Sequence, residues 1–90
     1  MQILIKYWFE FNTSNDIPSS IRLGCGVTAF DYSDAMRLLT QKILVDGQIP
    51  VIKNCIENVD IRQLDQGHVI PNMYTPSSRG IWFPLGYQEK

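Results

Sequence analysis

The sequence predicts one small α+β domain: an antiparallel sheet of three or four strands, in β-β-α-β order with a possible further edge strand, carries one helix on one face. Residues 3–11 and 21–29 alternate apolar and polar side chains with a period of two, which is typical of strands. Residues 31–46 instead repeat apolar side chains at helical spacing. The whole chain, residues 1–90, is long enough for one hydrophobic core, so we expect a single domain.

The first two strands are expected to form an antiparallel hairpin across the turn-forming residues 12–20. One register matches the two apolar faces and also sets Glu10 opposite Arg22 and Trp8 opposite Gly24. Opposite charges and an aromatic ring over a strand glycine both favour this register. The expected pairs on the apolar face are Phe11 with Ile21, Phe9 with Leu23, Tyr7 with Cys25, and Ile5 with Val27.

The helix predicted over residues 31–46 has recognisable ends. Asp31 is the expected N-cap, and Asp34 at position N3 places a carboxylate near the positive end of the helix dipole. Gly47 as the C′ residue, followed by Pro50, is expected to end the helix. The side chains expected to face the sheet are Tyr32, Ala35, Met36, Leu39 and Ile43, with Leu38 and Val45 widening the stripe.

The remaining elements are shorter. Residues 51–60 carry apolar side chains at irregular spacing, which we interpret as a third strand that could include a bulge. Asp60 is then placed to cap a single helical turn over residues 61–64. Residues 79–84 resemble a short edge strand that Pro84 ends, because proline cannot donate to a sheet ladder.

The composition argues against several classes of function. With a net charge of −1 and a pI of about 5.6, the chain lacks the basic surface that nucleic-acid binding requires. No apolar segment approaches the length of a membrane span, and the apolar N-terminal stretch is too short for a secretory signal. Two cysteines, Cys25 and Cys55, are too few for a disulfide scaffold, so we expect free thiols in a cytoplasmic protein. No cofactor motif is present, and no cofactor is expected.

His68 is the only histidine and follows Asp65 by three residues, in a segment expected to be a loop. One interpretation makes it a metal ligand or general base that Asp65 orients. A metal site would need Cys25, Cys55 or carboxylates from distant elements, because there is no second histidine and no paired-cysteine motif. The interpretation that we favour is a clasp, in which the two ring nitrogens hold two parts of the loop together.

Cys25 is the second catalytic candidate, as a nucleophile with His68 as its base. The hairpin places Cys25 on the buried face, where the pKa of a thiol rises and the thiolate is rare. We therefore expect Cys25 to be buried and unreactive. Its neighbours Gly24 and Gly26 do not form a phosphate-binding loop, because the spacing is wrong and the segment lies within a strand.

Two features predict a binding surface. Small residues leave the outer face of the hairpin bare beside a tryptophan, and residues 65–90 combine prolines and aromatic side chains with few charges. Such a segment packs either on its own domain or on a partner, and the sequence favours neither. The expected partner-binding residues are Trp8, Gly24, Gly26, Tyr74, Arg79 and Trp82.

Three stretches are similar to motifs of a family of small uncharacterised bacterial proteins: GCGVTAFDYSDAMRLL at residues 24–39, DQGHVIPNM at residues 65–73, and RGIWFP at residues 79–84. The family pattern has a GCGVTA-type strand that enters a helix, an HVxPNM-type loop and a closing RGxWFP. The resemblance implies a bacterial, cytoplasmic protein. It implies no activity, and no functional residue is carried over from it.

Two hypotheses for function follow. The first is a non-enzymatic interaction module that acts as a homodimer, an adaptor or an immunity-type partner of a bacterial protein. It predicts a flat apolar surface built from the tryptophans, the two strand glycines and Tyr74. The second is a small enzyme or metal-binding protein centred on His68, with Asp65 or a cysteine as its neighbour.

Overall fold

The computed structural model describes residues 3–12, 21, 23–43 and 51–84, and the fold is α+β as the sequence predicts. Four antiparallel strands form one open sheet in the order β3-β1-β2-β4. The elements are β1 (Ile5–Phe11), β2 (Cys25–Ala29), α1 (Tyr32–Lys42), β3 (Ile52–Glu57), the 3-10 turns η2 (Ile61–Gln63) and η3 (Ile70–Asn72), and β4 (Gly80–Phe83).

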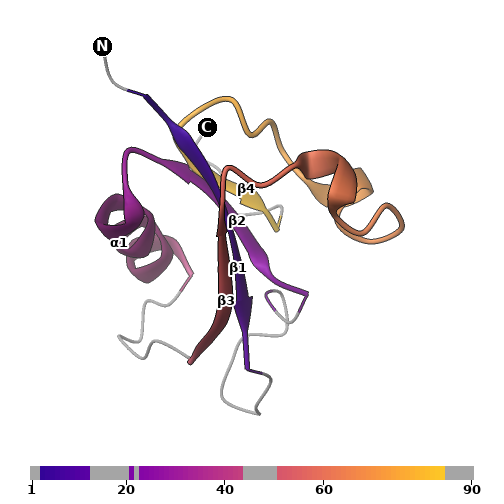
Figure 1. Cartoon of the computed structure of the whole chain (residues 1–90), viewed down its shortest axis with the longest axis horizontal. Coiled ribbons are helices and arrows are strands. Elements are labelled where there is room, and N and C mark those ends of the chain that lie inside the picture. The colour runs from indigo at the N-terminus through magenta and orange to yellow at the C-terminus, as the bar shows by residue number, and fades with distance from the viewer. Residues whose placement is uncertain (1–2, 13–20, 22, 44–50, 85–90) are drawn as a thin grey trace.

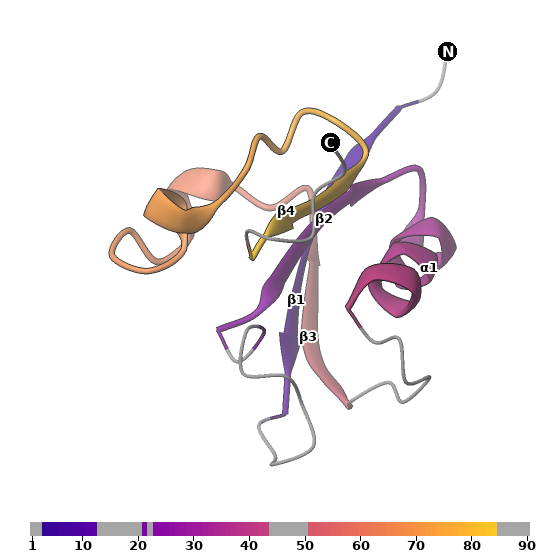
Figure 2. The same cartoon turned by 180° about the vertical axis from the view of Figure 1, so that it is seen from behind.

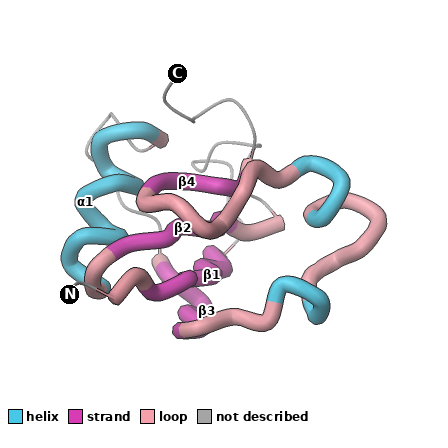
Figure 3. The backbone as a smooth tube through the Cα atoms, turned by 90° about the horizontal axis from the view of Figure 1, so that it is seen from above, coloured by secondary structure: helices cyan, strands magenta, loops and turns pink. Residues whose placement is uncertain are grey.

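The sheet is covered on both faces. Helix α1 packs over β2 and β4 on one side, and the irregular segment between β3 and β4, which contains η2 and η3, lies on the other side (Figures 1 and 2). Seen from above, the strands follow one another as β4, β2, β1 and β3, so that β3 and β4 form the two edges (Figure 3). The helix is therefore displaced away from β3.

Each face has its own hydrophobic cluster. The cluster on the helix side combines odd-numbered residues of β1 and β2 with the apolar stripe of α1 and its C-cap, one residue before β2 and one residue of β4. Its buried members are Tyr7, Phe9, Phe11, Ile21, Cys25, Val27, Ala29, Ala35, Leu38, Leu39, Ile43 and Ile81. The cluster on the opposite face consists of Trp8, Val59, Val69, Trp82 and Phe83, with Ile61, Leu64 and Met73 packed against it. Period-two alternation in β1 thus supplies side chains to both clusters.

The expected hairpin register is wrong by two residues. Phe9 pairs with Cys25 instead of Leu23, and Trp8 pairs with Gly26 instead of Gly24. A shift of two residues keeps every side chain on its own face, so apolar alternation cannot distinguish the two registers. The strand also begins later than expected, because the N–H of Gly24 donates to the Ile21 carbonyl at 3.0 Å and closes a turn.

The expected contact between Glu10 and Arg22 is not part of this fold as described. Glu10 pairs with Asn54 on β3, the strand on the other side of β1, and Arg22 lies outside the described residues. Glu10 therefore gives no support to the expected register.

Helix α1 begins as predicted. The side chain of Asp31 caps it by accepting a hydrogen bond from the Asp34 N–H at 2.8 Å. Most of the predicted stripe is buried, although Tyr32 is 45% exposed and Met36 is only partly buried. The backbone N–H of Ile43 still bonds to Leu39, and the expected stop at Gly47 and Pro50 lies outside the described residues.

The later elements agree with the sequence. Strand β3 pairs with β1 and contains a bulge: Glu10 and Phe11 face Asn54 and Ile52, which leaves Lys53 without a partner on β1. Asp60 caps η2 through the Arg62 N–H at 3.0 Å. Strand β4 is an edge strand that ends at Phe83, directly before Pro84.

A stability measurement can test how closely the tryptophans approach the sheet. A Cβ atom at Gly26 would lie 2.5 Å from three atoms of the buried Trp82 ring, so Gly26→Ala should lower the free energy of unfolding by about 1–3 kcal/mol. Gly67→Ala is the matched control, because its Cβ would meet only Asp65 Oδ1 at 3.4 Å. Urea unfolding of both variants checks this, and equal midpoints would contradict it.

Candidate functional site

The bare strip expected on the outer face of the hairpin is filled by the protein itself. The Trp82 ring lies on Gly26, and the Trp8 ring lies against Gly24, whose missing Cβ would be 2.8 Å from Trp8 Cε2. The two rings stack with their centroids 5.9 Å apart at an angle of 29°. Gly24 has a φ of 127°, a conformation that a residue with a side chain rarely adopts. Glycine is therefore needed at both positions.

This packing changes the expected partner-binding surface. Trp8 is 3% exposed and Trp82 is 1% exposed, and both strand glycines are buried as well, so none of the four is available to a partner in this conformation. Tyr74 and Arg79, by contrast, are exposed. The described part of the tail, up to Pro84, packs on its own domain through Val69, Trp82 and Phe83. The flat apolar surface that the sequence predicts from the two tryptophans is therefore not present in this structure.

Arg79 has a structural contact that the sequence analysis missed. Its Nε donates to Asp34 Oδ2 at 2.8 Å and its second terminal nitrogen donates to Asp34 Oδ1, so the pair is bidentate. The guanidinium carbon also lies 5.4 Å from the centre of the Phe30 ring. Asp34 is almost fully buried and accepts a further bond from the Phe30 N–H at 3.1 Å.

The pKa of Asp34 is lowered to about 2, chiefly by the hydrogen bonds from Arg79, even though burial acts in the opposite direction. Thr28 adds a second connection nearby, because its buried hydroxyl donates to the Pro76 carbonyl at 2.6 Å. Together the two contacts hold residues 76–79 against the junction of β2 and α1. Asp34 and Arg79 are 45 positions apart, and the sequence offered only the carboxylate at N3 as a signal.

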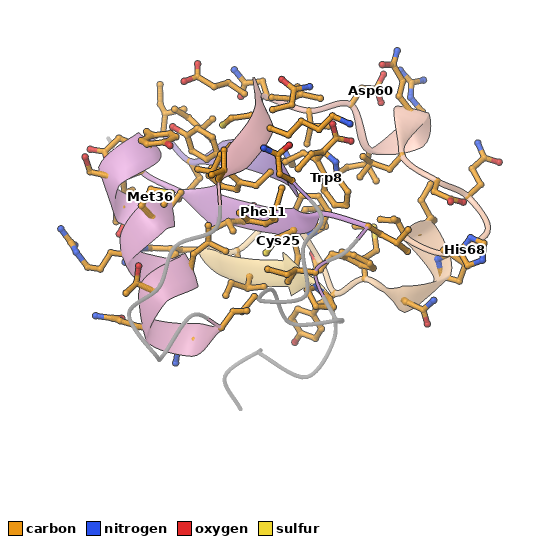
Figure 4. All side chains as sticks on the ribbon, turned by 90° about the horizontal axis from the view of Figure 1, so that it is seen from below. Trp8, Phe11, Cys25, Met36, Asp60 and His68 are labelled. Atoms are coloured by element: carbon orange, nitrogen blue, oxygen red, sulfur yellow. The ribbon has the colours of Figure 1, made fainter. Side chains whose placement is uncertain are left out.

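The Asp65–His68 pair forms, but the histidine is not the clasp. The His68 side chain is 73% exposed and lies far from Cys25 at the outer end of the irregular segment (Figure 4). Its Nδ1 is 3.2 Å from Asp65 Oδ2. Asp65 holds the turn instead: its Oδ1 accepts from the N–H groups of Gly67 and His68, and its carbonyl accepts from Val69 and Ile70.

The same contacts favour the ionised form of Asp65. Hydrogen bonds from the Gly67 N–H and from the His68 side chain lower the pKa of Asp65. Asn72 completes the turn by donating from Nδ2 to the His68 carbonyl at 2.9 Å. The turn places Val69, which is 2% exposed, in the cluster with the tryptophans. These contacts are the means by which the loop keeps one path.

The catalytic candidates do not converge. Cys25 is completely buried in the helix-side cluster, and burial raises the pKa of its thiol, so it is not a nucleophile in this fold. His68 lies in the loop on the other face, without Cys25 beside it. Within residues 3–12, 21, 23–43 and 51–84, no three side chains of His, Cys, Asp or Glu are grouped as metal ligands would be.

One surface remains that the sequence analysis did not single out: the edge strand β3. It is the last strand of the sheet on its side, and four of its six residues are exposed. Ile56 is 39% exposed and Val51, just before the strand, is 68% exposed. Cys55 is partly buried against the helix-side cluster, and burial together with the nearby Glu57 carboxylate raises the pKa of its thiol. The other edge is different, because the Tyr74 N–H donates to Trp82 of β4 at 2.7 Å.

Comparisons with protein-family models, with curated proteins and with solved structures gave no match. None of the helices in the described part of the chain has the length and the apolar character needed to span a membrane.

Acid denaturation should report the Asp34–Arg79 pair. The folded-state pKa of Asp34, about 2, lies below its ordinary value of 3.8, so its contribution to stability is present above pH 4 and is lost as the pH falls from 4 to 2. Between those limits the free energy of unfolding of the wild type should fall by roughly 1–2 kcal/mol more than that of Arg79→Met. The difference is smaller than the pKa shift alone would give, because solvent screens the partly exposed guanidinium.

Arg37→Met is the control for that experiment. Arg37 is exposed, and its 3.7 Å approach to Asp34 is too long for a hydrogen bond. Its acid profile should follow the wild type. Urea midpoints measured at several pH values between 2 and 5 check both variants, and parallel profiles for wild type and Arg79→Met would contradict the assignment.

Replacing the two residues of the loop pair should separate their roles. Asp65→Ala removes the acceptor of two backbone N–H groups, whereas His68→Ala removes a mostly exposed ring. We expect Asp65→Ala to lower the Tm clearly and His68→Ala to leave it almost unchanged, as followed by circular dichroism. A larger loss for His68→Ala would restore the histidine clasp.

Proposed function

We propose that the protein is a non-enzymatic bacterial interaction module of the cytoplasm, which binds a protein partner along the free edge of β3. The observation that carries the proposal is that β3 is an edge strand with exposed apolar side chains. Among the described residues no strand pairs with its outer side, it lies away from α1, and apolar side chains at Val51 and Ile56 are exposed along it. An open edge strand presents a row of backbone donors and acceptors to another chain.

Strand addition suits such an edge. Main-chain hydrogen bonds to the added strand supply affinity, and alternate side chains on the two faces supply specificity. On the helix side the added strand would meet Cys55 and Glu57, and on the other side it would meet Asn54 and Ile56. The resemblance to small bacterial proteins supports the proposed origin and compartment, and the acidic net charge agrees with a protein partner more than with nucleic acid.

The alternative of a small enzyme or metal protein has less support. Its centre, His68, is an exposed ring beside one exposed carboxylate, and both groups are used within the turn. A general base needs a shaped site around the reacting atoms, and a metal needs further ligands. No arrangement among the described residues favours this alternative.

Site-specific photo-crosslinking tests the proposal. A benzophenone amino acid at Ile56, on the exposed edge, should give a discrete covalent adduct with a protein in bacterial cells after irradiation. The same amino acid at Gln66, which is exposed in the Asp65 turn, is the matched control and should give none. Mass spectrometry then identifies what is attached. Absence of an adduct at Ile56, or equal adducts at both positions, would contradict the proposal.

A further inference from the structure

Along β3, the backbone N–H and C=O groups of alternate residues point away from β1. Two hydrogen bonds fix which residues of β1 bond to the β3 side: the Asn12 N–H donates to Val51 at 3.0 Å, and the Lys6 carbonyl accepts from Val59 at 3.1 Å. Even-numbered residues of β1 therefore bond toward β3, because bonding direction alternates along an antiparallel strand. The backbone N–H and C=O groups of their partners on β3, Asn54 and Ile56, therefore point toward β1. It follows that the N–H and C=O groups of Cys55 and Glu57 point to the free edge.

Two residues of opposite charge lie at equal distances along the strand on either side of Cys55. Lys53 and Glu57 lie two positions before and two positions after Cys55, with opposite signs, and both are exposed. Neither forms an ion pair with another described residue. Lys53 is also the bulge residue, so it has no partner on β1. A strand with this pattern is complementary to a second copy of itself in the antiparallel direction.

We infer that β3 pairs with β3 of a second copy of this chain, antiparallel, about a twofold axis at Cys55. This inference rests on the proposed function and names its partner. In this register Cys55 faces Cys55 of the second copy, and Lys53 faces Glu57 of the second copy on both sides of the axis. Opposite charges directly across an antiparallel pair stabilise it. The two sheets become one continuous sheet, and the interface is the self-complementary kind that a twofold axis requires.

Other registers satisfy fewer constraints. A shift by one residue would oppose outward-pointing backbone groups to inward-pointing ones, so the ladder could not form. A shift by two residues would set Cys55 opposite Glu57 and leave Lys53 without a carboxylate partner. In the inferred register, Ile56 of one copy also lies diagonally across the axis from Ile56 of the other, within reach of apolar contact. Backbone direction, charge and the exposed isoleucine thus select the same pairing.

Charge reversal tests the register. Light scattering at tens of micromolar protein and low salt should show a dimer of the wild type. Lys53→Glu sets like charges opposite each other at two positions and should weaken dimerisation by about tenfold or more. Lys53→Glu combined with Glu57→Lys restores both pairs with their signs exchanged and should restore the dimer. Lys42→Glu, at the end of α1, is a control with the same change of net charge.

The outcomes are decisive in both directions. A monomeric wild type would overturn the inference, and Lys53 and the bulge would then serve to protect the edge from pairing. A dimer that the charge reversals leave unchanged would place the interface elsewhere. Failure of the double variant to recover would overturn the register. Circular dichroism shows that each variant is folded, which is expected because both substituted residues are exposed.

Cysteine crosslinking provides an independent test. In a hydrogen-bonded antiparallel pair the Cα atoms are about 5.5 Å apart, a separation that a disulfide can span. Copper–phenanthroline, as the oxidant, should join two Cys55 thiols into a covalent dimer, while the buried Cys25 stays reduced. Cys55→Ser should dimerise without crosslinking. If photo-crosslinking at Ile56 captures only a different protein, the proposed function stands and the homodimer is wrong; if it captures nothing, both are wrong.

Discussion

The ion pair between Asp34 and Arg79 is the interaction on which the arrangement of the chain depends. Its carboxylate stands at the start of α1 and accepts both the Phe30 N–H and the guanidinium, while Asp31 caps the same turn. The end of β2, the start of the helix and the approach to β4 therefore meet at one side chain. Buried charges are stable only when their hydrogen bonds are satisfied, and here the fork of the arginine matches both carboxylate oxygens.

The second face of the sheet follows from the same contact. Because Arg79 is held beside α1, the next residues are aligned with the edge of β2, and Trp82 is placed on Gly26. Trp8 then lies between Gly24 and the ring of Trp82. The cluster is closed from outside by Val69, whose position is set by the Asp65 turn. Its one unsatisfied polar atom is the Trp82 Nε1, which is buried with no hydrogen-bond partner among the described residues.

The features that the sequence predicted are local ones. The cap at Asp31, the buried stripe of α1 and the cap at Asp60 each depend on residues a few positions apart. The irregular spacing of apolar residues in β3 is also local, although its bulge forms against β1. The hairpin register was missed because both candidate registers bury the same side chains. The partner of Asp34 was missed because nothing in the spacing of residues 34 and 79 relates them. For the candidate site, the sequence identifies the aromatic residues but not their burial against one another. The edge position of β3 depends on strand order, which residue spacing within the strand does not encode.

The position of β4 has a consequence for how the protein is made. A ribosome releases the chain from its N-terminus, so β1, β2 and α1 are available before residues 80–83 have been synthesised. During that interval Gly26 and the outer edge of β2 have no cover, and Trp8 has no ring to stack on. The nascent chain therefore carries an exposed strand edge beside an exposed tryptophan, a combination that chaperones bind and that neighbouring nascent chains can pair with. This exposure ends when β4 pairs with β2 and the Trp82 ring covers Gly26.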